Sequence, residues 1–210
     1  MPRTLFRIAL PLIAALLATG QAAAQSDAGL YEPAPDPDAS FVRLIAPDAD
    51  YGTIATKAMN GMEDVTAYVS VPPGSVEVKA GGMNTTVQVE KGNYYTVVLG
   101  ADDTPTTLTD TIIASPAKAD LAFYNLTDKP GLSLYVPAAT ANVAEGVDPG
   151  ATAAVSLRAP LTLDFEVRDG DTVVATIPAV ELRRKEGVSV VITGSGGSYS
   201  GFASNNVFLY

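Results

Sequence analysis

Residues 161–177 read LTLDFEVRDGDTVVATI, and this stretch decides the fold class of the 210-residue chain. Apolar residues at the odd positions from Leu161 to Val167 alternate with polar residues at the even positions. A period of two is that of a half-buried β-strand. Asp169-Gly170 is a strong hairpin-turn signal, and residues 172–177 return as a second strand. The stretch therefore predicts a β-hairpin.

Segments of the same kind lie on both sides of this hairpin. Turn signals such as Pro72-Pro73-Gly74, Gly81-Gly82 and Asp148-Pro149-Gly150 separate short apolar or alternating runs. Strands of this length with turns every 8–12 residues or so favour β-sandwiches, and no segment has the helical period needed to cover a parallel sheet. The sequence predicts an all-β protein with two tandem antiparallel β-sandwich domains, residues 41–115 and 116–210, divided near Ser115-Pro116-Ala117.

The two halves resemble each other as a degenerate duplication. Residues 90–100 have a counterpart in residues 185–194: each is a charged turn with a glycine, then a buried strand, then a second glycine. The ending Phe208-Leu209-Tyr210 is interpreted as an ordinary closing edge strand.

The N-terminus carries the pattern of an export signal. Arg3 and Arg7 precede an apolar run, and Ala22-Ala23-Ala24 supplies small residues for cleavage, so residues 1–24 are predicted to be a signal peptide. No later run is apolar for long enough to cross a membrane. Residues 25–40 place a proline at every second position from 33 to 37, which predicts an extended arm.

The composition excludes several kinds of chemistry. The chain has no histidine and no cysteine, so nucleophile systems that use an imidazole or a thiol are absent, and soft-metal sites lose their two commonest ligands. Asp102, Asp103 and Asp110 offer oxygen ligands without the spacing of a known calcium loop. We expect no catalytic residue, no cofactor and no metal, and a protein that works by binding.

Charge narrows the class of partner. Removing residues 1–24 takes away two of the 13 basic residues and none of the 23 acidic ones, which leaves a net charge of −12. Nucleic acid is an unfavourable ligand for such a surface, and an acidic polysaccharide would need a local basic patch. The one candidate patch, residues 183–185, is followed by Glu186 and is interpreted as a charged strand end.

A partner-binding site is predicted where the arm meets the first strand. The arm has an apolar pair, Leu30-Tyr31, for which packing onto its own domain is an equally good explanation. In a strand at 41–43, Phe41 and Arg43 share one face and Val42 takes the other. If Val42 fills the core, Phe41 and Arg43 lie outward beside Tyr31, as an aromatic and arginine pair of the kind common at interface hot spots.

The chain is similar to the AlgF family of periplasmic alginate O-acetylation proteins. The resemblance consists of short blocks along the mature chain, at residues 29–35 (GLYEPAP), 40–43 (SFVR), 92–98 (GNYYTVV), 125–129 (NLTDK) and 191–196 (VITGSG).

The resemblance implies a non-catalytic adaptor in the periplasm, required for alginate O-acetylation during exopolysaccharide biosynthesis. The implied partners are periplasmic SGNH-type O-acetyltransferases and the membrane-bound acyltransferase of the alginate machinery. The alternative from another class is a secreted carbohydrate-binding β-sandwich that contacts polysaccharide directly.

Overall fold

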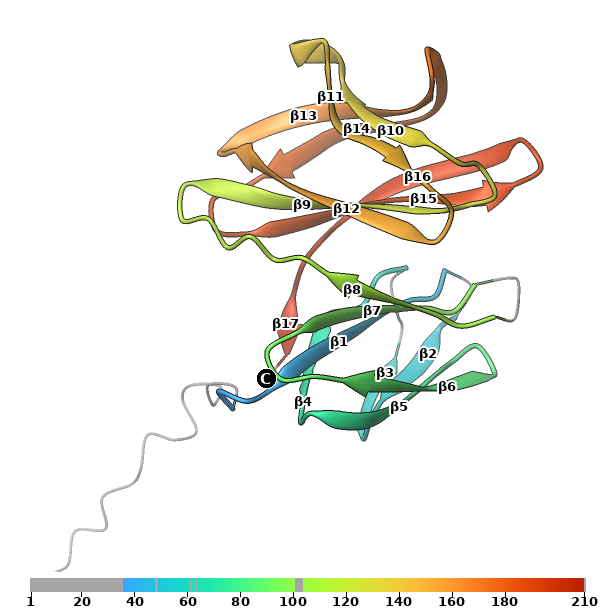
Figure 1. The fold of residues 1–210 in the computed structure, drawn as a ribbon, viewed down its shortest axis with the longest axis vertical. Coiled ribbons are helices and arrows are strands. Elements are labelled where there is room, and N and C mark those ends of the chain that lie inside the picture. Colours follow the sequence, from blue (N-terminus) through green and yellow to red (C-terminus); the bar gives the residue numbers. More distant parts are fainter. Residues whose placement is uncertain (1–35, 48, 61, 63, 101–103, 210) are drawn as a thin grey trace, which may run out of the picture. The chain divides into compact units, whose positions relative to one another are not determined.

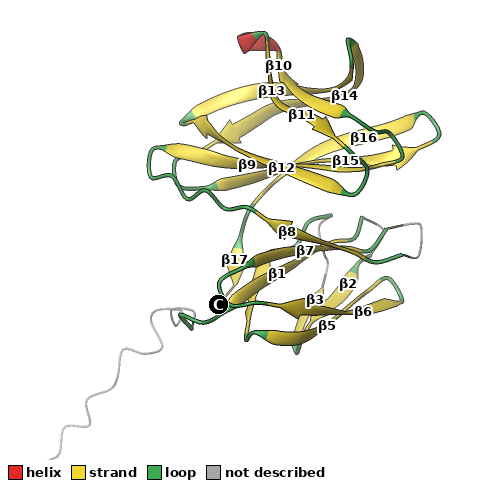
Figure 2. Ribbon diagram, in the orientation of Figure 1, coloured by secondary structure: helices red, strands yellow, loops and turns green. Residues whose placement is uncertain are grey.

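A computed structural model describes residues 36–47, 49–60, 62, 64–100 and 104–209, which belong to one compact unit, Ala34–Tyr210. The predicted signal peptide, and the arm up to residue 35, lie outside the described residues. Strands joined by turns make up the described chain, apart from one short 3-10 helix, η2 (Pro137–Ala139) (Figure 2). The predicted all-β fold is confirmed.

The first sandwich is built from the first eight strands and the last one. One sheet has the strand order β17-β4-β1-β7-β8, and the other β3-β2-β5-β6 (Figure 1). The strands are β1 (Ser40–Ile45), β2 (Tyr51–Ile54), β3 (Lys57–Asn60), β4 (Tyr68–Val71), β5 (Gly74–Ala80), β6 (Met83–Val89), β7 (Tyr94–Val98), β8 (Thr106–Asp110) and β17 (Phe208–Leu209).

The second sandwich is built from the remaining strands. Its sheets have the orders β12-β9-β15-β16 and β11-β10-β13-β14. The strands are β9 (Lys118–Thr127), β10 (Leu132–Val136), β11 (Ala141–Val147), β12 (Ala151–Arg158), β13 (Leu161–Asp169), β14 (Thr172–Leu182), β15 (Gly187–Ser195) and β16 (Ser198–Asn205). The predicted hairpin at 161–177 is β13 and β14, which pair antiparallel around Gly170.

Both sandwiches repeat one topology. In each, the first strand pairs antiparallel with the fourth and parallel with the seventh, and the seventh pairs antiparallel with the eighth. The predicted counterparts at 90–100 and 185–194 contain β7 and β15, which are equivalent strands in this scheme. The sandwiches were predicted to be antiparallel, and most strand pairs are, but β1 with β7, β9 with β15 and β4 with β17 are parallel pairs.

Each sandwich has its own apolar core between its two sheets. Val42, Val78 and Val97 are fully buried in the first core, and Phe123, Leu134 and Phe165 in the second. A third cluster joins residues of both halves, with Ile45, Val65, Val98 and Leu108 packed against Tyr124 and Val191. The two halves therefore share a buried apolar contact.

The chain ends in the first sandwich. After β16, residues 206–209 run back so that β17 pairs with the edge of β4, Phe208 opposite Tyr68 and Leu209 opposite Val69. The ending is an edge strand, as predicted, but it extends a sheet of the first half. The separate stability of residues 41–115 and 116–210 stays a prediction.

Candidate functional site

Strand β1 carries two of the three predicted partner-binding residues. Val42 is in the first core, and Phe41 and Arg43 share the opposite face, as the alternation predicts. The expectation that they lie outward is corrected, because Phe41 is only 8% exposed and Arg43 is fully buried. The physical reason is that Phe208 of β17 and Tyr124 of β9 cover that face. Tyr31 lies outside the described residues.

All three nitrogens of the Arg43 guanidinium donate hydrogen bonds between the two sandwiches. Its Nε donates a hydrogen bond to Thr96 Oγ1 (2.9 Å), its Nη2 to the Tyr124 hydroxyl (2.6 Å) and its Nη1 to Asn206 Oδ1 (2.8 Å). Its Cζ also lies 4.3 Å from the ring centroid of Tyr68. A buried charge is tolerated only when its donors are satisfied in this way.

Asp110, at the end of β8, balances this charge through bridging hydroxyls. Its Oδ2 accepts hydrogen bonds from Tyr68 (2.8 Å) and Thr96 (2.5 Å), and its Oδ1 accepts one from Tyr124 (2.6 Å). Thr96 and Tyr124 therefore each accept from Arg43 and donate to Asp110. We call Arg43, Tyr68, Thr96, Asp110, Tyr124 and Asn206 the interface network. Both carboxylate oxygens of Asp110 are thus used within the network, and Asp102 and Asp103, the other members of the predicted oxygen-ligand set, lie outside the described residues.

The electrostatics keep this network in one protonation state. Burial is the main reason that the pKa values of Tyr68 and Tyr124 are raised above 10.0, and the nearby Arg43 offsets only part of that effect. For Arg43, burial lowers the pKa, but Tyr124, Tyr68 and Asp110 outweigh it and the net shift is upward. These directions favour neutral tyrosines and a charged arginine, and the hydrogen bonds of the network link the two sandwiches.

An aromatic cluster adjoins the network. The rings of Phe41 and Tyr94 are stacked with centroids 4.7 Å apart, and those of Tyr68 and Phe208 are stacked at 5.2 Å. Edge-to-face contacts join the two stacks, such as Tyr68 with Tyr94 at 5.7 Å. Rings in these geometries attract one another beyond their burial alone. Phe41 is therefore part of a packing cluster.

A cleft of about 550 Å³ lies between the two sandwiches. Cavities of this size at domain boundaries are common ligand sites. The described residues that line it carry hydroxyl, backbone and apolar groups and no ionisable side chain: Pro47, Val98, Gly100, Thr104, Thr106, Leu126, Thr127, Pro149, Gly150, Thr193, Gly194 and Ser195.

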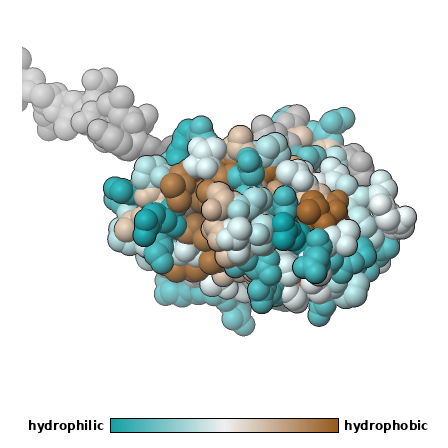
Figure 3. Space-filling model, turned by 90° about the horizontal axis from the view of Figure 1, so that it is seen from above, coloured by the Kyte–Doolittle hydropathy of each residue, from teal (hydrophilic) through white to brown (hydrophobic). Residues whose placement is uncertain are grey.

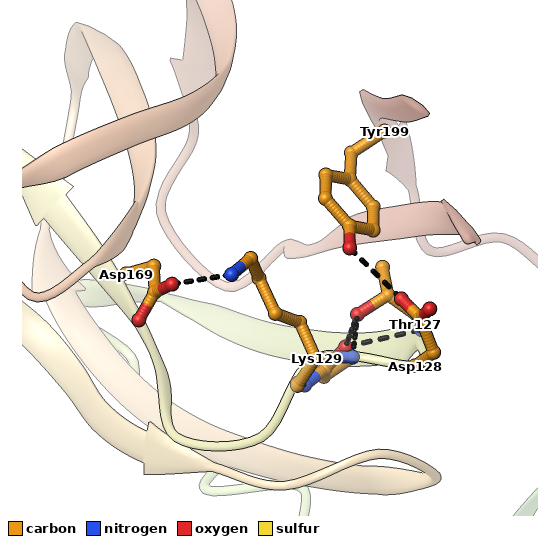
Figure 4. Close-up of polar contacts among 6 residues, drawn as sticks. Thr127, Asp128, Lys129, Asp169 and Tyr199 are labelled. Carbon is orange, nitrogen blue, oxygen red and sulfur yellow. Dashed lines mark hydrogen bonds and ion pairs between the residues drawn. The ribbon is translucent and has the colours of Figure 1, made fainter. Parts of the chain in front are cut away.

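Ionisable groups gather next to this cleft, where the turn after β9 meets the β15–β16 hairpin. Figure 4 shows the Tyr199 hydroxyl directed at Asp128, and Lys129 directed at Asp169. Tyr199 donates to Asp128 Oδ1 (2.9 Å), Gly196 N donates to Asp128 Oδ2 (3.0 Å), and Lys129 Nζ lies 2.5 Å from Asp169 Oδ2. We call these residues the rim cluster.

The rim cluster contains a hydroxyl beside a carboxylate, which is the arrangement of a nucleophile and its base. The hydrogen bonds from Gly196 and Tyr199 lower the pKa of Asp128, and the bond to Asp128 raises the pKa of Tyr199. These shifts hold the proton on Tyr199, and the pairing of Lys129 with Asp169 raises the pKa of Lys129 as well. These directions favour an ionised Asp128 beside a protonated Tyr199 and a protonated Lys129.

Other charged candidates from the sequence have structural partners. In the basic run 183–185, Arg183 pairs with Glu181 (2.8 Å) and Arg184 Nε donates to the Ala159 carbonyl (2.9 Å). No group of three or more acidic residues suited to a metal ion occurs within the described part of the chain.

The structure adds an arginine–aromatic pair that the sequence analysis missed. Arg168 of β13 lies with its Cζ 3.3 Å from the ring centroid of Tyr135 in β10, and it pairs with Glu166 at 2.6 Å. Figure 3 views the molecule from above Figure 1, and on that face hydrophobic side chains gather in a band and a smaller group among hydrophilic ones. The alternation in residues 161–167 places Arg168 on the polar face of its strand. It does not predict that the strand with Tyr135 is the neighbour.

The interface network was also missed as a unit. Its members come from β1, β4, β7, β8, β9 and the segment after β16, so sequence spacing carries no signal for it. The alternation in residues 41–43 predicts on which face of the strand Arg43 lies, but it does not predict which residues pack on that face.

The chain is similar to a known protein family and to several of its members. The family described as "Alginate O-acetyl transferase AlgF" matches residues 13–189. The alginate biosynthesis protein AlgF of Azotobacter vinelandii is 29% identical over 197 residues, covering 90% of this chain and 89% of that protein. That of Pseudomonas syringae pv. tomato is 28% identical over 178 residues, covering 83% of this chain and 79% of that protein.

A solved structure of the C-terminal domain of AlgF from P. aeruginosa is 26% identical, with a TM-score of 0.38, and covers 43% of this chain and 99% of that one. The described residues contain no helix with the length and apolar character of a membrane span. Since the family match extends over most of the sequence, the chain belongs to the AlgF family of alginate O-acetylation proteins.

Proposed function

We propose that this protein is a non-catalytic periplasmic adaptor required for the O-acetylation of alginate, acting through protein–protein contacts with the acetyltransferase machinery. The proposed partners are periplasmic SGNH-type O-acetyltransferases and the membrane-bound acyltransferase. Membership of the AlgF family supports the process, and the predicted signal peptide at residues 1–24 supports the compartment.

The absence of histidine and cysteine from the sequence is the observation that carries the non-catalytic part, and the rim cluster agrees with it. Acyl transfer needs a nucleophile whose proton is taken by a base of matched pKa. Here the pKa of Asp128 falls while those of Tyr199 and Lys129 rise, and the chain has no imidazole or thiol to replace them. The described residues that line the adjacent cleft add no ionisable side chain.

Charge supports contacts with proteins over contacts with alginate. Alginate carries a carboxylate on each sugar, whereas the chain has a formal net charge of −10 and a cleft without a described cation in its lining. Affinity electrophoresis through gels that contain alginate separates the two functions. We expect unretarded migration for an adaptor, and retardation would favour the carbohydrate-binding alternative.

Turnover of an acetyl ester tests the non-catalytic part. Purified mature protein, incubated with p-nitrophenyl acetate, should release p-nitrophenol no faster than an inert acidic protein does. Deletion of the gene in the source bacterium should at the same time lower the acetyl content of its alginate, and the intact gene should restore it. Turnover well above the control would contradict the proposal, as would normal acetylation in the deletion strain.

Tyr31 remains a proposed partner contact on the N-terminal arm. Tyr31→Ala should leave the melting temperature unchanged and reduce pull-down of the SGNH-type acetyltransferase, because interface tyrosines contribute strongly to binding. Unimpaired pull-down would remove the arm from consideration. Substitution of Phe41 or Arg43 would affect such binding only by disturbing the fold, since both side chains are buried.

A further inference from the structure

Strand β6 (Met83–Val89) lies at the edge of the sheet β3-β2-β5-β6, and its recorded strand pairing among the described residues is with β5. An edge strand presents a row of backbone N–H and C=O groups to solvent. Natural proteins protect such edges with charges, prolines, bulges or short strands, because an open edge pairs with other chains. An unprotected edge therefore indicates a docking surface.

None of these protections is present in β6. Its seven residues, MNTTVQV, include no charge, proline or glycine, and its register with β5 is continuous from Met83 to Val89. Most other edge strands carry a protection: Lys57 in β3, Asp110 at the end of β8, Glu145 and two register shifts in β11, Arg158 at the end of β12, Pro178 and Glu181 in β14, and a length of two residues in β17.

The repeated topology provides matched comparisons. The equivalent of β6 in the second sandwich is β14, which carries Pro178 and shifts register twice along β13. The other uncharged edge is β16, but β14 lies against it: a Cβ added at Gly201 would be 2.8 Å from Ile177 Cδ1. β6 thus differs from the strand that holds the same place in the other half.

The turn before β6 determines which backbone groups are free. Gly81 and Gly82 both have positive φ (58° and 84°), as in a two-residue hairpin turn, which closes on a hydrogen-bonded pair, here Ala80 with Met83. Hydrogen-bonded and non-bonded pairs then alternate along the strands. The N–H and C=O groups of Asn84, Thr86 and Gln88 therefore point to the open edge, and all three side chains are exposed.

We propose that the β6 edge binds an extended segment of the SGNH-type acetyltransferase by strand addition, with Thr86 at its centre. This inference rests on the proposed adaptor function and names its contact surface. An open backbone edge is complementary to a strand, and its neutral side chains admit an uncharged or basic segment to this acidic chain.

Two other occupants fit less well. The N-terminal arm has Pro33, Pro35 and Pro37 at every second position, so it lacks the N–H groups that would face the edge. A second copy would bring together two mature chains, each with a net charge of −12, which repel each other.

The test uses purified mature protein and the purified SGNH-type acetyltransferase of the same bacterium. Thr86→Pro removes one edge-facing N–H and leaves the pairing with β5 intact, a place where proline is tolerated. We expect it to weaken the complex about tenfold or more, because a buried partner carbonyl loses its donor. Thr86→Val keeps the N–H and should bind as the wild type does. Amide exchange measured by NMR should slow at Asn84, Thr86 and Gln88 on binding.

Each outcome has one meaning. If Thr86→Pro is misfolded by circular dichroism, the double variant Thr86→Lys/Gln88→Lys, at exposed positions, replaces it and should weaken binding likewise. Wild-type binding that these variants leave unchanged would overturn the edge inference and leave the adaptor function standing. Failure of the wild type to bind would overturn both. A wild-type dimer that Thr86→Pro dissociates would assign the edge to a second copy.

Discussion

The charged side chain of Arg43 is buried where the two sandwiches meet, and Thr96, Tyr124 and Asn206 accept its hydrogen bonds. Thr96 and Tyr124 in turn donate hydrogen bonds to Asp110. A buried pair of this kind contributes little compared with well-packed apolar residues, but removal of one member leaves an uncompensated charge. At the scale of the residue, we therefore expect the network to be sensitive to single substitutions.

Replacement of Arg43 by alanine tests this sensitivity. Arg43→Ala should lower the free energy of unfolding by about 3–5 kcal/mol, because Asp110 remains buried without its counter-charge. Arg158→Ala, at an exposed position of β12, is the matched control and should change it by no more than about 0.5 kcal/mol. Urea unfolding followed by circular dichroism measures both. Equal stability of the two variants would contradict a structural role for Arg43.

The raised pKa values of Tyr68 and Tyr124 predict instability in alkali. In the unfolded chain these phenols ionise near pH 10.0, whereas in the folded chain they stay protonated to higher pH. Their contribution to stability is therefore complete below about pH 10 and is lost as the pH rises above it. Tyr124→Phe should flatten the decline of unfolding free energy between about pH 9 and 11, relative to its own value at pH 7. An unchanged slope would contradict this assignment.

At the scale of the element, β17 connects the end of the chain to the first sheet. It has two residues in the ladder, yet Phe208 contacts the rings of Phe41, Tyr68 and Tyr94. Just before it, Asn206 accepts from Arg43 and from Ser189 Oγ (2.8 Å). Side-chain packing, more than backbone pairing, fixes this strand.

Truncation of the Phe208 ring separates the contribution of side-chain packing from that of backbone pairing. Phe208→Ala should lower the free energy of unfolding by about 1–3 kcal/mol, the lower part of the range for aromatic truncation, because the ring is only partly buried. Val207→Ala, whose side chain is 53% exposed, should change it by no more than about 0.5 kcal/mol. Thermal melts of both proteins provide the comparison. If the two variants melt alike, backbone pairing holds β17 in place.

At the scale of the whole molecule, two sandwiches with one topology share an apolar contact and the interface network. Since each has its own core, we expect fragments 26–115 and 117–210 both to fold, with dispersed amide spectra. Both should melt below the full chain, because each loses the shared cluster around Ile45 and Tyr124.

A shorter fragment serves as the control for the second half. Residues 117–206 should melt like 117–210, because β17 pairs with β4, which that fragment lacks. Unfolded spectra for both halves would show that the two sandwiches are one folding unit.

The sequence by itself determined the local structure and the limits of the chemistry. A period of two in residues 161–167 and the Asp-Gly turn specify β13 and β14, since alternation of side chains is a property of a single strand. The same rule placed Val42 in the core and Phe41 with Arg43 on the other face. The absence of histidine and cysteine, which needs no structure, removed the commonest nucleophile systems.

Only the tertiary structure decided what covers each face. Phe41 and Arg43 are buried by Phe208 and Tyr124, and the bond from Arg43 to Asn206 spans 163 residues of sequence. The parallel pairing of β1 with β7 depends likewise on the path of the strands between them. Local patterns record how a strand alternates, because that depends on its own backbone. The neighbour that packs on a face depends on contacts between distant segments, which no local pattern encodes.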